Sequence, residues 1–266
     1  MGFLTGKTAI ITGAGRATLL NGRCGSIGYG IATAYAKEGA NLVITGRNVK
    51  KLEAAKEELE QHYGIRVLIL QADINAGGDN EATANAVVKK TMETFGRIDV
   101  LINNAQASAS GVTLADHTTE QFDLAVYSGL YAAFYYMKAC YPYLKETEGT
   151  VLNFASGAGL FGNYGQCAYA AAKEGIRGLS RVAATEWAKD HININVICPL
   201  AWTAQLEQFQ LNYPDAFKAN VKMPPMGHFG DPEEEIGRVC VQLAHPDFKY
   251  MTGDTVTLEG GMGLRP

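Results

Sequence analysis

The sequence has no apolar run approaching the roughly 20 residues that a membrane-spanning helix needs, and nothing at its start resembles a secretion signal. We therefore expect a cytoplasmic protein that inserts into no membrane. Its cysteines form no CxxC pair and no Cys/His cluster with metal-ligand spacing, so no disulfide framework and no metal site is predicted. They are Cys24, Cys140, Cys167, Cys198 and Cys240. Scattered basic residues, 23 against 27 acidic ones, disfavour nucleic acid as a partner.

Short apolar segments rich in β-branched residues alternate with longer segments of helical periodicity, a pattern typical of repeated β-α-β units. Strands are predicted at residues 8–12, 41–45, 66–71, 100–103, 150–154, 193–198 and 255–258. Helices are predicted at residues 28–38, 49–62, 80–95, 119–145, 166–190 and 232–244. No linker interrupts the series. Residues 1–266 are therefore predicted to form one α/β domain, a doubly wound (Rossmann) parallel sheet of seven strands with helices on both faces.

Residues 200–230 interrupt the alternation with a segment rich in aromatic residues and methionine. It contains Trp202, Phe209, Tyr213, Phe217, Met223, Met226 and Phe229. Ligands of open parallel sheets bind beyond the carboxyl ends of the strands, and this segment follows such an end. We expect a substrate-binding loop or lid; an oligomer contact or a satellite patch of core is the alternative.

Two glycine-rich turns follow the first strand, Thr12-Gly13-Ala14-Gly15-Arg16 and Gly25-Ser26-Ile27-Gly28. Glycines let a backbone approach a pyrophosphate closely, and a helix that begins there offers free N–H groups and a favourable dipole. Residues 17–24 separate the turns, which a dinucleotide-binding loop normally joins. We predict that both turns contribute to one phosphate site.

The second strand ends in Thr45-Gly46-Arg47-Asn48, where an NAD enzyme normally places a carboxylate on the ribose 2′-hydroxyl. No carboxylate is present. The Arg47 guanidinium, joined by Arg16 or Arg23, could hold the 2′-phosphate of NADP. NADP is therefore favoured and NAD remains possible; the alternative is that these arginines only line a solvated rim.

Tyr169 and Lys173 lie four residues apart in a helical segment and so share one face. A fixed positive charge beside a phenol makes the phenolate accessible near neutral pH. Tyr169 could then take a proton from a substrate alcohol or return it to a carbonyl, with Lys173 beside it. Ser156, just past the strand at 150–154, would hold the reacting oxygen.

A second pair, Tyr141 and Lys145, has the same spacing, and Ser128 precedes Tyr141 by the same interval as Ser156 precedes Tyr169. Spacing cannot choose between the two sets. Location favours Tyr169, because Ser156 follows a strand's carboxyl end while Ser128 falls inside an apolar helical pattern. We interpret Tyr141, which precedes Pro142, as a packing residue.

Six motifs are spread along the chain: Thr12-Gly13…Gly28, Asp73, Asn103-Asn104-Ala105, Ser156, Tyr169-xxx-Lys173 and Gly253-Asp254…Gly260-Gly261. Taken together, they resemble the short-chain dehydrogenase/reductase family over almost the whole length of the chain. The resemblance implies a nicotinamide cofactor and a homotetramer. It implies that the cofactor contacts are Gly13, Arg16, Ser26, Ile27, Gly28, Arg47, Asp73, Ile74, Asn104, Ala105, Tyr169, Lys173, Pro199 and Thr203. It implies substrate contacts at Gln106, Ser156, Tyr169, Trp202 and Phe209.

The sequence departs from the family pattern at three places. Gln106 follows Asn103-Asn104-Ala105 where the family has glycine, and Leu200 follows Pro199 where glycine is again usual. Gly129 stands near the position of the family's helix asparagine. The usual proton relay from the lysine is therefore in doubt, and Gly129 is not predicted to be catalytic.

Within the family, segments 102–111, 159–166 and 198–206 resemble the branch that oxidises the C12 hydroxyl of bile acids. This implies reversible oxidation of the 12α-hydroxyl of cholate or deoxycholate to the 12-oxo form. An apolar lid is compatible with a steroid. Two alternatives stay open: a reductase for another steroid position or an alicyclic or sugar ketone, and a nucleotide-sensing protein that has lost catalysis.

Overall fold

The computed structural model describes residues 2–263, so residues 1 and 264–266 of the predicted domain lie outside the described part. Its sheet has seven parallel strands in the order β3-β2-β1-β4-β5-β6-β7. They are β1 (Thr8–Thr12), β2 (Asn41–Gly46), β3 (Val67–Gln71), β4 (Val100–Asn103), β5 (Thr150–Phe154), β6 (Asn193–Pro199) and β7 (Thr255–Leu258). The predicted fold class is confirmed, and each strand boundary agrees within one residue.

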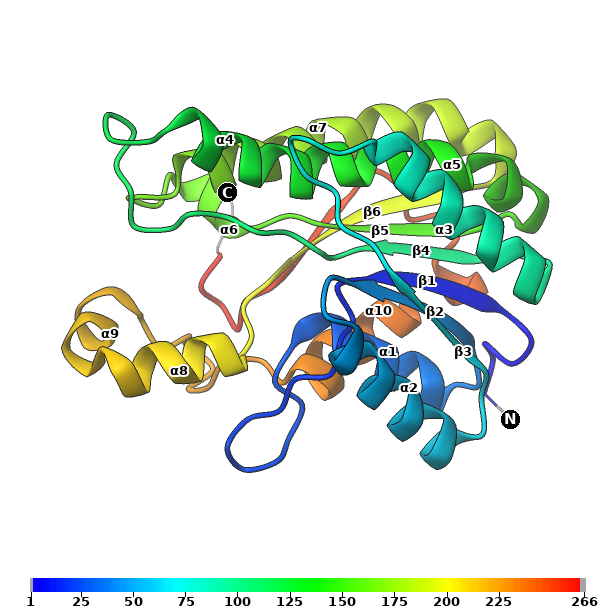
Figure 1. Cartoon of the computed structure of the whole chain (residues 1–266), viewed down its shortest axis with the longest axis horizontal. Helices are drawn as coiled ribbons and strands as arrows, with labels where there is room; N and C mark the ends of the chain where they lie inside the picture. The colour runs from blue at the N-terminus through cyan, green and yellow to red at the C-terminus, as the bar shows by residue number, and fades with distance from the viewer. Residues whose placement is uncertain (1, 264–266) are drawn as a thin grey trace.

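Helices cover both faces of the sheet, as Figure 1 shows. One face carries α1 (Ile27–Lys37), α2 (Val49–Tyr63) and α10 (Arg238–Gln242), and the other carries α3 (Asn80–Phe95), α5 (Ala132–Thr147) and α7 (Cys167–Trp187). Side chains alternate across each strand, so Ile11 packs into one apolar core and Ile10 into the other. Burial on both faces explains why most strand residues are apolar.

The predicted helix at 119–145 is wrong as one continuous helix. It consists of α4 (Thr119–Ala125), the π-helical turn η1 (Val126–Tyr131) and α5. Ser128 lies within the turn, and its hydroxyl bonds the carbonyl oxygens of Leu124 and Ala107. Such a side-chain bond to a preceding carbonyl loosens a helix locally. The predicted helix at 232–244 likewise begins with a π-helical turn, η3 (Pro232–Gly237), before α10.

The expected loop at 200–230 is largely helical. It contains α8 (Ala204–Asn212) and α9 (Pro214–Asn220), neither of which has a fully buried residue. Both helices project beyond the carboxyl ends of the strands, at the left of Figure 1. The remaining elements are α6 (Gly157–Phe161) and the 3₁₀ turns η2 (Ala188–Asp190) and η4 (Pro246–Phe248).

The strand order reverses between β1 and β4, which lie side by side although β2 and β3 come between them in sequence. In a doubly wound sheet this reversal opens a crevice at the carboxyl ends of the strands. The predicted cofactor and catalytic residues follow β1, β2, β3, β4, β5 and β6, so the topology brings them to this one edge.

Candidate active site

The loop after β1 is tied to the loop after β4. The Thr12 side-chain oxygen accepts hydrogen bonds from the backbone N–H groups of Asn104 and Ala105, each at 3.0 Å. The Asn104 side chain donates to the Thr12 carbonyl oxygen at 2.9 Å. Gly13 has a φ of 72°, and a Cβ there would lie 3.0 Å from the Cα of Ala105. Both the left-handed backbone and the close approach favour glycine at position 13.

Residues 17–24, which separate the two glycine turns, form a small hairpin. Thr18 and Cys24 face each other in an antiparallel bridge, and the N–H of Gly25 donates to the Ala17 carbonyl oxygen at 2.8 Å. The insertion therefore leaves and rejoins the loop at nearly the same point. The Ser26 hydroxyl lies 3.5 Å from the Gly15 carbonyl oxygen, so the two turns are adjacent in space.

The N-terminus of α1 has the properties of an anion site. Ser26 is its N-cap, but the Ser26 side chain caps none of the first N–H groups, and the first turn has no acidic residue. A Cβ at Gly28 would lie 2.3 Å from the Gly13 carbonyl oxygen, so glycine allows the helix to approach the β1 turn. Uncapped N–H groups beside two glycine turns fit the pyrophosphate of a dinucleotide.

The three arginines considered for a 2′-phosphate lie in different surroundings. The Arg16 Nε lies 2.5 Å from a Glu58 carboxylate oxygen, and this hydrogen bond raises the pKa of Arg16. Arg23 forms an ion pair with Asp231. Arg47 is exposed after β2, and within residues 2–263 its side chain has no ion pair. Arg47 is therefore the guanidinium that remains free to bind an anion.

The other predicted cofactor residues line the same edge. Asp73 is exposed and Ile74 is buried in the loop after β3. Pro199 is the last residue of β6. Thr203 is the N-cap of α8, where its Oγ1 accepts a hydrogen bond from the N–H of Leu206 at 3.2 Å. Its hydroxyl hydrogen remains available to a ligand.

The three predicted catalytic side chains meet at the ends of β5 and α7. The Lys173 Nζ lies 5.4 Å from the centre of the Tyr169 ring and donates to the Phe154 carbonyl oxygen at 2.6 Å. Ser156 is the N-cap of α6, and its Oγ accepts the N–H of Ala158 at 3.1 Å. The Ser156 hydroxyl also lies near enough to the phenol to lower the pKa of Tyr169.

Burial controls the protonation of this group. It lowers the pKa of Lys173 to about 7, because the ammonium loses its hydration. Burial also raises the pKa of Tyr169, and the hydrogen bond with Ser156 opposes that rise. The expectation that Lys173 itself lowers the pKa of Tyr169 is not seen here. The chain thus places a readily deprotonated lysine beside a buried phenol, which suits proton transfer near neutral pH.

The second Tyr/Lys pair lies elsewhere and serves packing. The Tyr141 hydroxyl donates to Asp190 at 2.7 Å, and the Lys145 ammonium pairs with the same carboxylate at 2.8 Å. The Tyr141 ring packs against Trp187, with centroids 4.7 Å apart. Pro142 lies inside α5. This pair holds the end of α7 to α5.

Arg177 is a site residue that the sequence reasoning missed. It is buried, and its guanidinium donates to the Ser156 carbonyl oxygen at 3.4 Å and to Thr255 Oγ1 at 3.0 Å. The adjacent Glu174 carboxylate accepts hydrogen bonds from it at 3.0 to 3.2 Å. Arg177 is one turn beyond Lys173, so the repeat at positions 169, 173 and 177 could have revealed it. It braces the backbone that presents Ser156.

The segment after β6 gathers aromatic rings above the crevice. Trp202 contacts Phe229 with centroids 5.5 Å apart and Phe217 at 6.1 Å. Phe209 contacts Phe217 and Tyr213, each at 6.0 Å. The projecting helices therefore carry an aromatic cluster rather than converging polar groups, as an apolar ligand requires.

The hairpin at 17–24 braces this lid. The N–H of Leu20 donates to a Glu207 carboxylate oxygen at 2.9 Å, and the N–H of Ala204 donates to the Gly25 carbonyl oxygen at 2.8 Å. The ion pair of Arg23 with Asp231 adds a contact beyond α9. The insertion thus connects the phosphate loop to the base of α8.

Two of the three departures from the family pattern touch each other. A Cβ at Gly129 would lie 2.7 Å from the Gln106 Cδ, so the Gln106 side chain fills the space beside the glycine. Its Nε2 donates to the Ala125 carbonyl oxygen at 3.3 Å. The third, Leu200, pairs with the chain after the lid: its carbonyl oxygen accepts the N–H of Gly230 at 3.1 Å.

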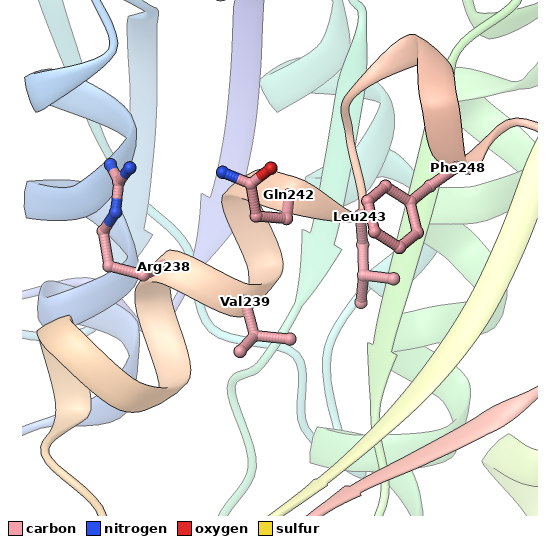
Figure 2. A pocket seen from close by; sticks show the side chains of 5 residues that line it. All are labelled: Arg238, Val239, Gln242, Leu243 and Phe248. Atoms are coloured by element: carbon pink, nitrogen blue, oxygen red, sulfur yellow. The ribbon is translucent and has the colours of Figure 1, made fainter.

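A hollow of about 340 Å³ lies along α10 and the turn after it. Val239, Leu243 and Phe248 give it an apolar wall, with Arg238 and Gln242 at its edge (Figure 2). It contains no acid/base pair and none of the predicted site residues.

Within the described chain, no helix has the length and apolarity to cross a membrane. The same residues include no group of three or more His, Cys, Asp or Glu suited to a metal ion.

Many known sequences are similar to this chain over most of its length, and two of them are described below. Residues 22–263 match the family model described as enoyl-(acyl carrier protein) reductase. The chain is 67% identical over 266 residues to a 12α-hydroxysteroid dehydrogenase of Clostridium sp., covering 100% of both proteins. It is 31% identical over 250 residues to general stress protein 39 of Bacillus subtilis, covering 93% of this chain and 84% of that protein.

Solved structures have the same fold. A protein from Burkholderia xenovorans described as a short-chain dehydrogenase/reductase superposes with a TM-score of 0.88 at 27% identity, over 100% of both chains. L-sorbose reductase from Gluconobacter frateurii, solved with NADPH and L-sorbose, superposes with a TM-score of 0.84 at 26% identity, over 97% of both chains.

Proposed function

The chain belongs to the short-chain dehydrogenase/reductase family, and from this premise we propose that it is a 12α-hydroxysteroid dehydrogenase. It would oxidise the 12α-hydroxyl of bile acids such as cholate and deoxycholate to the 12-oxo form, reversibly, with NADP(H). The observation that carries this proposal is the 67% identity to a 12α-hydroxysteroid dehydrogenase over the entire length of both proteins.

The lid supports a steroid over a sugar. Rings of Trp202, Phe209, Phe217 and Phe229 contact one another on the segment that follows β6. A rigid apolar steroid gains from such a surface, whereas a sugar needs several convergent polar groups. The likeness to L-sorbose reductase is therefore assigned to the shared fold and not to a shared substrate.

In the proposed mechanism, Tyr169 and Ser156 act on the reacting oxygen. The Ser156 hydroxyl donates to that oxygen and orients it, and the Tyr169 oxygen takes the hydroxyl proton during oxidation or returns it during reduction. The nicotinamide, when bound, accepts or supplies the hydride. Lys173 sits beneath the phenol and stabilises its anion when charged. Arg177 keeps the Ser156 backbone in place.

The residues of this chain fit a dinucleotide. The N–H groups at the start of α1 and the turns at Gly13 and Gly28 would hold the pyrophosphate. Asp73 and Ile74 would contact the adenine, and Asn104 and Ala105 the adenosine side of the crevice. Tyr169 and Lys173 would reach the nicotinamide ribose, and Pro199 and Thr203 the carboxamide.

The proposed preference for NADP depends on Arg47. It is exposed beyond β2 without an ion pair inside the described chain, and the loop offers no carboxylate in its place. A free guanidinium can bind the 2′-phosphate through two parallel hydrogen bonds. Arg16 is held by Glu58 and would contribute mainly positive potential.

We also propose that the protein acts in the cytoplasm as a homotetramer. Large apolar side chains are exposed on the α4, η1, α5 and α7 surface: Phe122, Leu124, Tyr131, Phe134 and Val182. A patch of this kind commonly marks a contact between subunits. Light scattering on the purified protein would give the number of subunits.

The substrate proposal is tested by absorbance of the reduced nicotinamide, with cholate, deoxycholate and chenodeoxycholate each offered with NADP and with NAD. Chenodeoxycholate has no 12-hydroxyl and is the control. We expect turnover of the first two only, faster with NADP. Turnover of chenodeoxycholate at a similar rate would contradict the assignment to C12.

The acid/base role is tested with a matched pair of variants. Tyr169→Phe should lower kcat by about 1,000-fold or more, because it removes the proton acceptor, while cofactor binding measured by nicotinamide fluorescence persists. Tyr141→Phe removes an identical hydroxyl from the packing pair and should leave kcat unchanged. An active Tyr169→Phe enzyme would refute the assignment.

A further inference from the structure

Two departures from the family pattern lie next to each other in the structure. Gln106 replaces a glycine after β4, and Gly129 replaces an asparagine in the helix. A Cβ on Gly129 would lie 2.7 to 2.8 Å from the Cδ, Nε2 and Oε1 atoms of Gln106. An asparagine at 129 would therefore require the end of the Gln106 side chain to move from its present position. Compared with the family pattern, the amide side chain comes from the loop instead of the helix, and it occupies the space beside position 129.

The Gln106 amide is bonded to a residue that packs against α7, the helix of the acid/base pair. Its Nε2 donates to the carbonyl oxygen of Ala125, the last residue of α4 before the π-helical turn. Turns of this kind leave carbonyls without their ordinary helical partner and occur often at functional sites. Ala125 is fully buried against Ala168 and Ala172 of α7, the residues directly before Tyr169 and Lys173.

The other end of the amide lacks a partner. The Gln106 Oε1 is buried and accepts no hydrogen bond from the protein within the described residues. A buried acceptor of this kind is normally satisfied by a ligand or an ordered water. A leucine or methionine would fill the space beside Gly129 without that cost, so packing alone does not account for a glutamine.

We propose that Gln106 is a positioning residue for proton transfer, whose Oε1 holds a water on the route between the Tyr169–Lys173 pair and solvent. The proposal rests on the alcohol oxidation proposed above. Each oxidation leaves on Tyr169 the proton taken from the substrate hydroxyl, and this proton must reach solvent before the next turnover. A water that donates one O–H to Gln106 keeps its oxygen free to accept that proton.

The groups around Gln106 are consistent with this role. Within residues 2–263 its side chain forms no ion pair and no hydrogen bond with a charged group. The helix α7, which packs against Ala125, contributes the titratable Tyr169 and Lys173. From η1, the Ser128 hydroxyl accepts the N–H of Ala107 at 2.9 Å and so fixes the backbone next to Gln106.

The first test is Gln106→Met, which retains the volume beside Gly129 but removes the amide. We expect kcat to fall about 10- to 100-fold, less than the roughly 100- to 10,000-fold for loss of a group that itself transfers the proton, with KM changed less than about twofold. The pH profile of kcat should shift and its solvent deuterium isotope effect should increase. Gln121→Met is the control: this glutamine of α4 also bonds one backbone group, the N–H of Thr118 at 3.1 Å. Unchanged kcat, pH profile and isotope effect in Gln106→Met would overturn the proposal.

The second test restores the family arrangement. Gly129→Asn alone should be crowded by Gln106, and Gln106→Gly alone should lose the amide. The double variant should exceed Gln106→Gly in kcat by about tenfold, since the amide returns from the helix side. A double variant no faster than Gln106→Gly would overturn the proposal, whether or not Gly129→Asn folds alone. The wild-type rate with cholate reports separately on the proposed function, because the Gln106 test uses only ratios between variants.

Discussion

Replacing Lys173 with methionine should abolish activity and stabilise the protein. Lys173 is 4% exposed, and burial lowers its pKa from 10.5 to about 7. That difference corresponds to about 5 kcal/mol of free energy by which the folded state disfavours the charged lysine. Methionine has a similar length and no charge, but it leaves the Phe154 carbonyl oxygen without its donor. That loss costs about 1–3 kcal/mol, so a net gain of roughly 2–4 kcal/mol remains.

The stability gained by Lys173→Met should decrease as the pH rises above about 7. Below a pH of about 7, Lys173 is charged in both the folded and unfolded states, and the buried ammonium destabilises the folded wild type to its full extent. As the pH rises from about 7 towards 10.5, the folded lysine is neutral while the unfolded one still binds its proton, so the wild type becomes relatively more stable. The advantage of Lys173→Met should therefore be largest near pH 6 and shrink by about 1.4 kcal/mol per pH unit above 7.

Urea unfolding of both proteins across this range measures the effect, and Tm near pH 6 should rise by on the order of 5 °C. Lys145→Met is the control. Lys145 is exposed, and its hydrogen bond with Asp190 raises its pKa, so this variant should show no gain that fades above pH 7. A Lys173→Met protein less stable than wild type near pH 6, or a difference independent of pH, would refute this reasoning.

Three further predictions concern the cofactor and the lid. Gly28→Ala should weaken cofactor binding at least about tenfold by fluorescence titration, because its Cβ would lie 2.3 Å from the Gly13 carbonyl oxygen; an unchanged Kd would show that the close approach is unimportant. Arg47→Asp should reverse the ratio of kcat/KM for NADP over NAD, and an unaltered ratio would exclude Arg47 from 2′-phosphate recognition. Glu207→Ala should raise KM for the bile acid about threefold without changing the Kd of the cofactor, since it removes the acceptor of the Leu20 N–H. Equal effects on both ligands would argue against a bracing role.

The sheet was predictable from the sequence because both of its faces are buried. Strands covered on both sides are mostly apolar and stand out from amphipathic helices, so their boundaries agree within one residue. The position of Ser156 at a strand's carboxyl end also favoured Tyr169 over Tyr141 as the proposed acid/base. The structure is consistent with this choice, since the Tyr141 hydroxyl is bonded to Asp190.

Other features depend on tertiary contacts and had no local signal. The π-helical turn η1 involves the bonds of Ser128 to Leu124 and to Ala107 from another segment. The position of the hairpin at 17–24 depends on contacts with Glu207, and of Gly25 beside it with Ala204, far along the chain. The segment at 200–230 has aromatic and proline content typical of a loop, yet α8 and α9 form within it.

The contact between Gln106 and Gly129 also could not be predicted from the sequence. Each departure was visible in the sequence, but each was interpreted alone. Only the geometry places the Gln106 side chain in the space beside Gly129. Arg177 was recognisable by its helical spacing from Lys173, although its bond to the Ser156 carbonyl was not.

The most direct test of the central claim is the structure of the product made from cholate, which carries secondary hydroxyls at C3, C7 and C12. Carbon NMR of the isolated product identifies which carbon has become a carbonyl. We predict a single product with the ketone at C12 and both other hydroxyls intact. A ketone at C3 or C7 would contradict the assignment, even if turnover with NADP were rapid.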